Sequence, residues 1–480
     1  MRSFDGTPIV AHFHPAVAVA AGGVAPTVLI GPGYASAGDT RPDQNIGDRI
    51  GSANLRRAGF NVLTWDPRGF GGSGGTAMFD SAAFEGRDVQ ALVDYVAAQP
   101  EALLDAPRDP RVGMSGSSYG GGIQFVAAAI EPRLDAIVPD IAWHSLATSF
   151  ARDGAFKAGW LLQICANGEV LGLAGGVTSR AGVQLGNTAP QLKSMCLEGN
   201  VTGALSAATK QWLADRGPAQ LLAAIRAPTL ITQGTVDTLF PPGQAIANYE
   251  VLRRNRVPVK MLWYCGGHGG CQMPAGDPGV LPRAGMNWLR RWLMRDKTVD
   301  TGPRFEWVDD TGVWRAGPDY PLAEAGAVKA SGSGSLGLLP SVSLTLGPLA
   351  PGTPPLSMLE LPYAAPPAKA DIVGEPTVSL SYQGTALPTS TFVYARVLNA
   401  RTQRVVGKQV TPIPLVLDGR RRTVTRRLEV IVSRAGPASD LRLQLLPSVG
   451  LYGPQRSAGG VGSLTVTSRL PIVDAARSGR

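Results

Sequence analysis

Short apolar runs rich in β-branched residues alternate with helical patterns along the first 296 residues. Runs of four to eight such residues between turn signals predict strands, and apolar positions at helical spacing predict helices. The predicted strands are residues 8–13, 26–30, 59–65, 112–115, 136–139, 229–233 and 259–264, and the predicted helices are residues 84–98, 119–130 and 283–295. This alternation predicts an α/β fold with a doubly wound, mostly parallel sheet covered by helices on both faces.

The alternation stops between residues 144 and 224, where residues 160–162, 190–197 and 205–213 have helical patterns. An insertion of this length between two sheet strands predicts a helical lid over the active face.

After residue 298 the pattern changes to short stretches that alternate apolar and polar residues, which predicts an antiparallel β-sandwich. The strand candidates are residues 342–346, 377–382, 391–398, 403–409, 422–432 and 441–446. The predicted organisation is a first core segment (1–143), the helical insertion (144–224), a second core segment (225–298) and the sandwich (299–480).

The composition agrees with a soluble protein of two or three domains, because 480 residues exceed the size of a single core. No apolar run is long enough to span a bilayer. The net charge is +9, and the densest basic run, residues 420–427, follows the turn signal Asp418-Gly419. A solvated hairpin explains this run better than a nucleic-acid site, and nothing in the sequence indicates an oligomeric state.

The four cysteines form two locally spaced pairs, Cys165 with Cys196 and Cys265 with Cys271, without the spacing of a zinc site. Two disulfides would favour an exported protein, and four free thiols a cytoplasmic one. The chain opens on a turn that enters a strand, so no signal peptide is expected in it. The compartment stays open.

The strongest chemical signal is a G-x-S-x-G motif at residues 116–120, between a predicted strand and a predicted helix. A sharp strand-to-helix turn exposes the central serine, and glycines two residues to either side allow the close chain approach. Ser118 is therefore the candidate nucleophile, and Ser115 and Ser117 are weaker ones. A second match at residues 71–75 lies in a loop with no helix directly after it.

A serine nucleophile needs a base, and the chain has four histidines. His12 and His14 lie in or just after the first predicted strand and are interpreted as structural. His144 begins the insertion, where it and Trp143 could line the pocket. His268 follows the last predicted strand in a glycine-rich loop, so it is the candidate base.

The acid is expected between the serine and the histidine in chain order. Asp237 follows a buried strand and is the candidate, with Asp140, which follows the preceding strand, as its competitor. The backbone N–H of Tyr119 and the hydroxyl of Tyr34 are candidate oxyanion donors. This chemistry requires no metal or organic cofactor.

At the serine motif, the Asp66-Pro67-Arg68-Gly69 loop, Asp237 and His268, the chain resembles the X-prolyl dipeptidyl-peptidase and cocaine-esterase family of serine hydrolases. The resemblance implies an α/β-hydrolase domain with a lid, a C-terminal jelly-roll sandwich and a small peptide or ester substrate. In that family a tyrosine hydroxyl joins the oxyanion hole, a position that Tyr34 matches.

Three functions remain open at this point. The first is an X-prolyl dipeptidyl-peptidase-like hydrolase, and the second a carboxylesterase or amino-acid ester hydrolase. The third belongs to another class, an inactive hydrolase-fold protein that binds a glycan through its sandwich.

Overall fold

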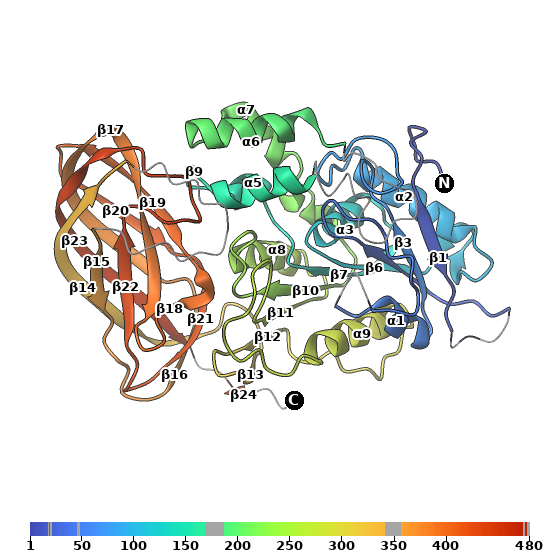
Figure 1. Ribbon diagram of the computed structural model, residues 1–480. Coiled ribbons are helices and arrows are strands. Elements are labelled where there is room, and N and C mark those ends of the chain that lie inside the picture. The colour runs from blue at the N-terminus through green and yellow to red at the C-terminus, as the bar shows by residue number, and fades with distance from the viewer. Residues whose placement is uncertain are drawn as a thin grey trace.

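The computed structural model describes residues 1–17, 19, 22–45, 49–168, 187–340, 357–473 and 476–477. A helix-covered sheet and an all-β sandwich lie side by side, with the helical insertion along one flank (Figure 1). The predicted fold class, a mostly parallel sheet followed by a β-sandwich, is confirmed.

The first sheet is parallel at its centre because its strands are joined through helices. In spatial order it comprises β1 (Ala11–His14), β3 (Asn61–Trp65), β2 (Thr27–Gly31), β6 (Val112–Ser117), β7 (Leu134–Asp140), β10 (Thr229–Gly234), β11 (Val259–Tyr264), β12 (Phe305–Val308), β13 (Trp314–Gly317) and β24 (Ala476–Arg477). Neighbours from β3 to β12 run parallel, whereas β1, β13 and β24 pair antiparallel at the two ends.

Helices cover both faces of this sheet, as predicted (Figure 1). One face carries α2 (Glu85–Ala97), α3 (Tyr119–Ile130) and α8 (Pro242–Arg254), and the other α1 (Ser52–Arg57) and α9 (Val280–Trp292). Each set of helices buries its apolar side chains against one face of the strands, so that two separate core clusters sandwich the sheet.

The described part of the insertion between β7 and β10 is mainly helical. Its elements are α4 (Leu146–Phe150), the short hairpin β8 (Ala151–Arg152) and β9 (Ala155–Phe156), α5 (Ala158–Ala166), α6 (Pro190–Thr202), α7 (Ala207–Ala214) and two 3₁₀ turns, Pro218–Gln220 and Leu222–Ala224. The Cys165–Cys196 disulfide joins α5 to α6. A second short hairpin, β4 (Leu104–Ala106) with β5 (Asp109–Pro110), follows α2.

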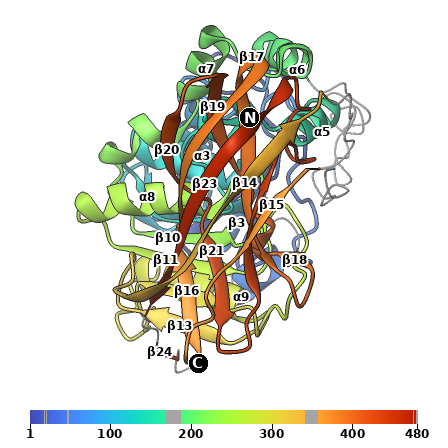
Figure 2. The ribbon, with the colours of Figure 1, turned by 90° about the vertical axis from the view of Figure 1, so that its left-hand side faces the viewer.

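The sandwich consists of antiparallel strands, seen face-on in Figure 2. They are β14 (Glu324–Leu338), β15 (Leu359–Pro362), β16 (Ala370–Gly374), β17 (Thr377–Asn399), β18 (Arg404–Val405), β19 (Thr411–Asp418), β20 (Arg422–Arg427), β21 (Ile431–Ala435), β22 (Leu441–Leu446) and β23 (Ala458–Val473). The predicted strand at 342–346 lies outside the described residues.

Three details of the sandwich differ from the sequence pattern. The stretches 377–382 and 391–398 form one strand, β17, because its first half pairs with β20 and β23 and its second half with β19 and β22. The stretch 403–409 forms only the short β18 and a 3₁₀ turn, η4 (Val406–Lys408). The stretch 422–432 divides into β20 and the start of β21.

Residues 305–317, assigned above to the sandwich, pair with the first sheet instead. Their strand β12 runs parallel to β11, and β13 returns antiparallel beside it. The apolar side chains of Phe305 and Trp307 are buried in the core on the α8 face, which explains why these residues extend that sheet.

Candidate active site

Ser118 occupies a strained turn between β6 and α3. Its backbone has φ 58° and ψ −115°, a combination that non-glycine residues rarely adopt. The two flanking glycines of the motif allow it, because a Cβ atom on Gly120 would clash with the carbonyl oxygen of Gly31, and one on Gly116 would lie 2.5 Å from that oxygen. The turn therefore presents the Ser118 hydroxyl at the carboxyl edge of the sheet.

His268 lies between Ser118 and Asp237. Its Nε2 is 2.7 Å from the Ser118 Oγ, and its Nδ1 is 2.6 Å from the Asp237 Oδ2. The His268 backbone N–H also donates to that carboxylate oxygen, at 3.1 Å. Three side chains that are far apart in sequence thus form a continuous hydrogen-bonded chain.

The loop that carries Asp237, residues 235–240, is called here the acid loop. The Asp237 side chain is fully buried, and its Oδ1 accepts the backbone N–H groups of Leu239 and Phe240, both at 2.9 Å. One carboxylate oxygen therefore fixes the turn while the other faces the imidazole.

Asp140, the competing acid, is fully engaged elsewhere. Its carboxylate accepts hydrogen bonds from Arg49 at 2.9 Å, Ser117 at 2.7 Å, Thr232 at 2.8 Å and Tyr264 at 3.0 Å. The structure thus brings Asp237, and not Asp140, to the histidine, and it turns the Ser117 hydroxyl away from it.

The loop that carries His268, residues 265–271, is called the histidine loop. The Cys265–Cys271 disulfide closes it, with the two Cα atoms 5.3 Å apart. Gly267, with φ 123°, lies so close to the acid loop that a Cβ atom there would be 2.5 Å from the Asp237 Cβ. Together with the Cys165–Cys196 disulfide of the insertion, both cysteine pairs noted in the sequence lie at disulfide distance.

The two proposed oxyanion donors occupy different surroundings. The Tyr119 backbone N–H belongs to the first turn of α3, where N–H groups have no acceptor within the helix. The Tyr34 ring packs against Phe70, Phe79 and Tyr119 at centroid distances of 5.1–5.6 Å. Its hydroxyl lies beside Gly168 of the insertion, two residues after the end of α5.

The two suggested pocket residues also differ. Trp143 is buried and packs against Phe240, whose ring meets the His268 imidazole edge-on at 5.1 Å. His144 instead hydrogen-bonds Asn248 on α8 at 2.9 Å, and burial lowers the pKa of its imidazole. Trp143 thus belongs to the aromatic group around His268, whereas His144 points toward α8. His12 and His14 lie in β1, the strand at one end of the sheet, whereas the site residues follow its central strands β6, β10 and β11.

Sequence reasoning missed two side chains that hold the acid loop. The buried Lys157 donates its ammonium to the carbonyls of Thr238 at 2.7 Å and Leu239 at 3.2 Å. Gln409, from the sandwich, donates its amide to the carbonyls of Thr235 at 3.2 Å and Asp237 at 2.9 Å. The one signal for Lys157 was a lone lysine within an apolar stretch, and Gln409 had none.

Lys157 lies in a charged environment shared by all three parts of the chain. Burial lowers the pKa of its ammonium to about 8, although Glu429 and Asp237 act to raise that pKa. Arg152 forms an ion pair with Glu429 and, like burial, lowers the pKa of Lys157. Among the described residues, no cluster of three His, Cys, Asp or Glu side chains could hold a metal ion.

Fold and site together define the α/β-hydrolase class, with a serine, a histidine and an aspartate at the carboxyl edge of a parallel sheet. A family model described as X-Pro dipeptidyl-peptidase (S15 family) matches residues 5–270. Because this match covers more than half of the chain, the protein belongs to that family of hydrolases, which confirms the resemblance noted from the sequence.

The curated relatives match only a short part of the chain. An uncharacterized 31.7 kDa protein from the traX-finO intergenic region of Escherichia coli is 35% identical over 86 residues, which are 18% of this chain and 28% of that protein. The chain thus spans 28% of the length of that relative.

Solved structures match over nearly the whole chain. A CocE/NonD family hydrolase from Staphylococcus aureus has a TM-score of 0.71 at 11% identity, covering 98% of this chain and 92% of that one. An alpha-amino acid ester hydrolase has a TM-score of 0.68 at 13% identity, covering 98% and 95%. At these identities the likeness establishes the fold. No helix among the described residues has the length and apolar character needed to cross a membrane.

Proposed function

We propose that this protein is a serine hydrolase in which Ser118 is the nucleophile, His268 the general base and Asp237 the residue that orients the imidazole. The observation that carries the proposal is the 2.7 Å separation of the Ser118 Oγ and the His268 Nε2, with Asp237 2.6 Å from the other ring nitrogen. Proton transfer by a general base requires this hydrogen-bond contact.

In the proposed mechanism, His268 takes the Ser118 proton as the hydroxyl attacks the substrate carbonyl carbon. The bond from that carbon to the leaving group breaks while His268 returns the proton to the leaving amine or alcohol. A water then attacks the acyl-enzyme with His268 again acting as base, which releases the acid and restores Ser118. Asp237 stabilises the imidazolium at both stages.

The oxyanion that forms in each attack needs donors aimed at it. The Tyr119 N–H is suited to this role because it stands at the positive end of the α3 dipole, next to the nucleophile. We assign the second donation to the Tyr34 hydroxyl, in line with the family resemblance, in which a tyrosine that Tyr34 matches by position joins the oxyanion hole.

The preferred substrate class is a small peptide with a penultimate proline, in line with family membership. A second candidate is an ester with an apolar acyl group. Aromatic contacts favour it, because Phe240 and Trp160 both meet the His268 ring edge-on, at 5.1 and 5.9 Å. Turnover of an X-Pro dipeptide anilide beside p-nitrophenyl butyrate separates the two, since an esterase would leave the anilide intact.

Labelling with a fluorophosphonate probe tests the mechanism itself. Wild-type protein should be labelled at Ser118, and Ser118→Ala should abolish labelling. Ser117→Ala is the matched control, because its hydroxyl contacts Asp140 and its removal should leave labelling within about twofold. An unlabelled wild type would instead favour an inactive protein that binds ligands through its sandwich.

We further propose that the protein matures in an oxidising compartment. The two cysteine pairs at disulfide distance support this, because such bonds persist outside the reducing cytosol. Thiol counting of the protein purified under alkylating conditions from its native host tests it, and four free thiols would refute it.

A further inference from the structure

One short segment of the sandwich, residues 404–409, reaches both catalytic loops. It comprises β18, the turn η4 and Gln409. Gly407 and Lys408 have left-handed backbones, with φ of 62° and 57°, and a Cβ atom on Gly407 would lie 3.0 Å from the carbonyl oxygen of Thr235. Left-handed non-glycine residues are uncommon and concentrate where function constrains the backbone.

The first contact of this segment is with the acid loop. Gln409 is 4% exposed, and its amide nitrogen donates to the carbonyls of Thr235 and of Asp237 itself. Because an amide nitrogen carries two protons, these two bonds use its whole donor capacity. The backbone on each side of the carboxylate is thereby tied to the sandwich.

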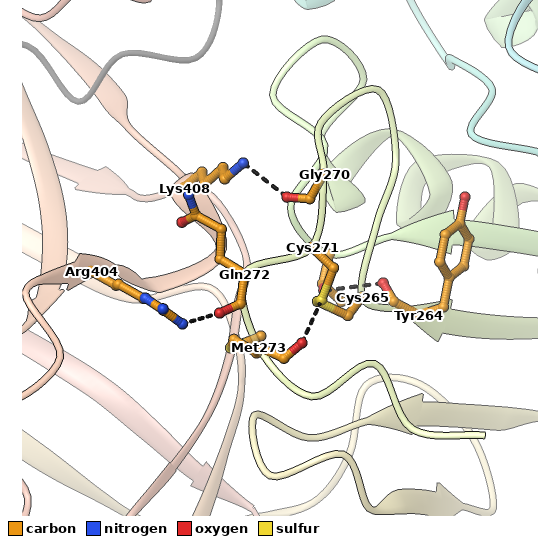
Figure 3. Close-up of a disulfide and its surroundings, with 9 residues drawn as sticks. Tyr264, Cys265, Gly270, Cys271, Gln272, Met273, Arg404 and Lys408 are labelled. Carbon is orange, nitrogen blue, oxygen red and sulfur yellow. Dashed lines mark hydrogen bonds between the residues drawn. A yellow bond between two sulfur atoms is a disulfide. The ribbon is translucent and has the colours of Figure 1, made fainter. Parts of the chain in front are cut away.

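The second contact is with the histidine loop and its continuation (Figure 3). The Lys408 ammonium donates to the carbonyl of Gly270 at 2.9 Å, and the Arg404 guanidinium donates to the carbonyl of Gln272. Gly270 is two residues after His268, and Gln272 directly follows Cys271. Both anchor points therefore flank the last residue of the closed loop.

Because of the Cys265–Cys271 disulfide, these contacts also restrict the position of His268. Four of the seven residues of the histidine loop are glycines, so its backbone has many accessible conformations when unrestrained. The Cys265–Cys271 bond joins the end of β11 to the anchored end of the loop. Because the disulfide-closed loop is attached to β11 at one end and bound by Lys408 at the other, the His268 imidazole has little freedom to move.

From this arrangement we propose that residues 404–409 position the Asp237–His268 pair, so that the sandwich sets the geometry of the catalytic base in addition to packing against the hydrolase domain. Gln409 holds the acid loop, Lys408 holds the histidine loop, and Arg404 holds the residue that directly follows it. These are positioning residues, and the inference rests on the proposed function because it assigns them to that reaction.

The test compares Lys408→Met with Lys408→Arg in the full chain with its disulfides intact. Lys408 is half-buried, so its replacement is compatible with folding. Lys408→Met should lower kcat for p-nitrophenyl butyrate about tenfold with KM within twofold, because the loss concerns orientation and not binding. Lys408→Arg keeps a donor and should recover most of that loss.

Arg401→Met is the matched control. Arg401 is an exposed cation just before the same segment, so Arg401→Met removes the same single positive charge from this end of the sandwich as Lys408→Met does. Its kcat should equal that of the wild type. Hydrogen exchange at residues 266–272 should become faster in Lys408→Met and stay unchanged in the control, which reports on the loop without relying on turnover.

Two results would overturn the inference: a wild-type kcat in Lys408→Met, whatever its exchange rates, or an equal fall in kcat in Arg401→Met. Either result in an active enzyme would reject the positioning role alone. A wild-type protein that neither turns over the ester nor takes up the fluorophosphonate would reject the proposed function, and the positioning role with it.

Discussion

All six residues of the acid loop are buried, whereas the histidine loop is only partly buried and borders a cavity of about 450 Å³ that Arg49, Tyr264 and Trp314 help to line. Asp237 fixes its own turn through two backbone N–H groups close by in the chain. The histidine loop relies on a disulfide and on cations of the sandwich. The acid loop therefore has a turn fixed by its own carboxylate in addition to the contacts it receives from Lys157 and Gln409, whereas the histidine loop has a disulfide in place of such a turn.

The largest effect should come from the acid loop. Asp237→Asn keeps an oxygen for the N–H groups of Leu239 and Phe240 but removes the acceptor of the His268 backbone N–H, so we expect a modest loss of stability. It removes the carboxylate that faces the imidazole, and kcat should fall about 10⁴-fold because the wrong tautomer is favoured. Ester hydrolysis and urea unfolding of the same preparations measure the two quantities.

Asp140→Asn is the matched comparison for that variant. It disturbs a buried carboxylate that Arg49, Thr232 and Tyr264 contact, without touching His268. We expect a larger loss of stability than in Asp237→Asn and a much smaller fall in kcat. The reverse pattern would make Asp140 the catalytic acid.

Removing the two disulfides should have effects of intermediate size. The disulfide that matters more for stability should matter less for kcat. Replacing Cys265 and Cys271 by alanine opens a short loop and should cost about 2 kcal/mol in the free energy of unfolding, whereas removing Cys165–Cys196, which closes a longer loop, should cost about 4 kcal/mol. In kcat the order should reverse, with about a tenfold fall for the first pair and little change for the second.

Urea unfolding and ester hydrolysis of the two double variants, each measured on the same preparation, check this reversal. If both double variants lost stability and kcat in the same proportion, the disulfide of the histidine loop would stabilise the whole fold and would not specifically restrain His268.

The difference between local and distant contacts also explains which site residues the sequence could predict. Ser118, Asp237 and His268 each follow a buried strand, in turns whose glycines or short polar side chains have local signatures, and the structure places them within hydrogen-bond distance. Lys157 and Gln409 bind backbone carbonyls 81 and 172 residues away. A carbonyl group is present at every residue, so no sequence pattern marks it as a partner.

The prediction of the fold from sequence patterns has the same limit. Periodicity predicted the parallel sheet and the sandwich because burial on one or both faces leaves its mark on each strand. It divided β17 into two strands, since it carries no information about a strand that exchanges partners midway. It also assigned residues 305–317 to the sandwich, although their pairing with β11 joins them to the first sheet.

The smallest expected effect concerns Lys157, the buried cation of the acid loop, and it appears in stability. The pKa of its ammonium is about 8 in the folded protein, against about 10.5 for an exposed lysine. Between these values the unfolded chain binds the extra proton, so the free energy of unfolding should increase as the pH rises.

From pH 8 to pH 10 this gain should reach about 2 kcal/mol relative to Lys157→Met, which has no group to titrate there. Urea unfolding of both proteins at several pH values measures the difference, and the variant cancels the titration of groups common to both. Parallel curves would mean that the acid loop does not hold a desolvated ammonium. The packing that distinguishes this loop from the histidine loop would then be looser than the contacts of Lys157 with Thr238 and Leu239 imply.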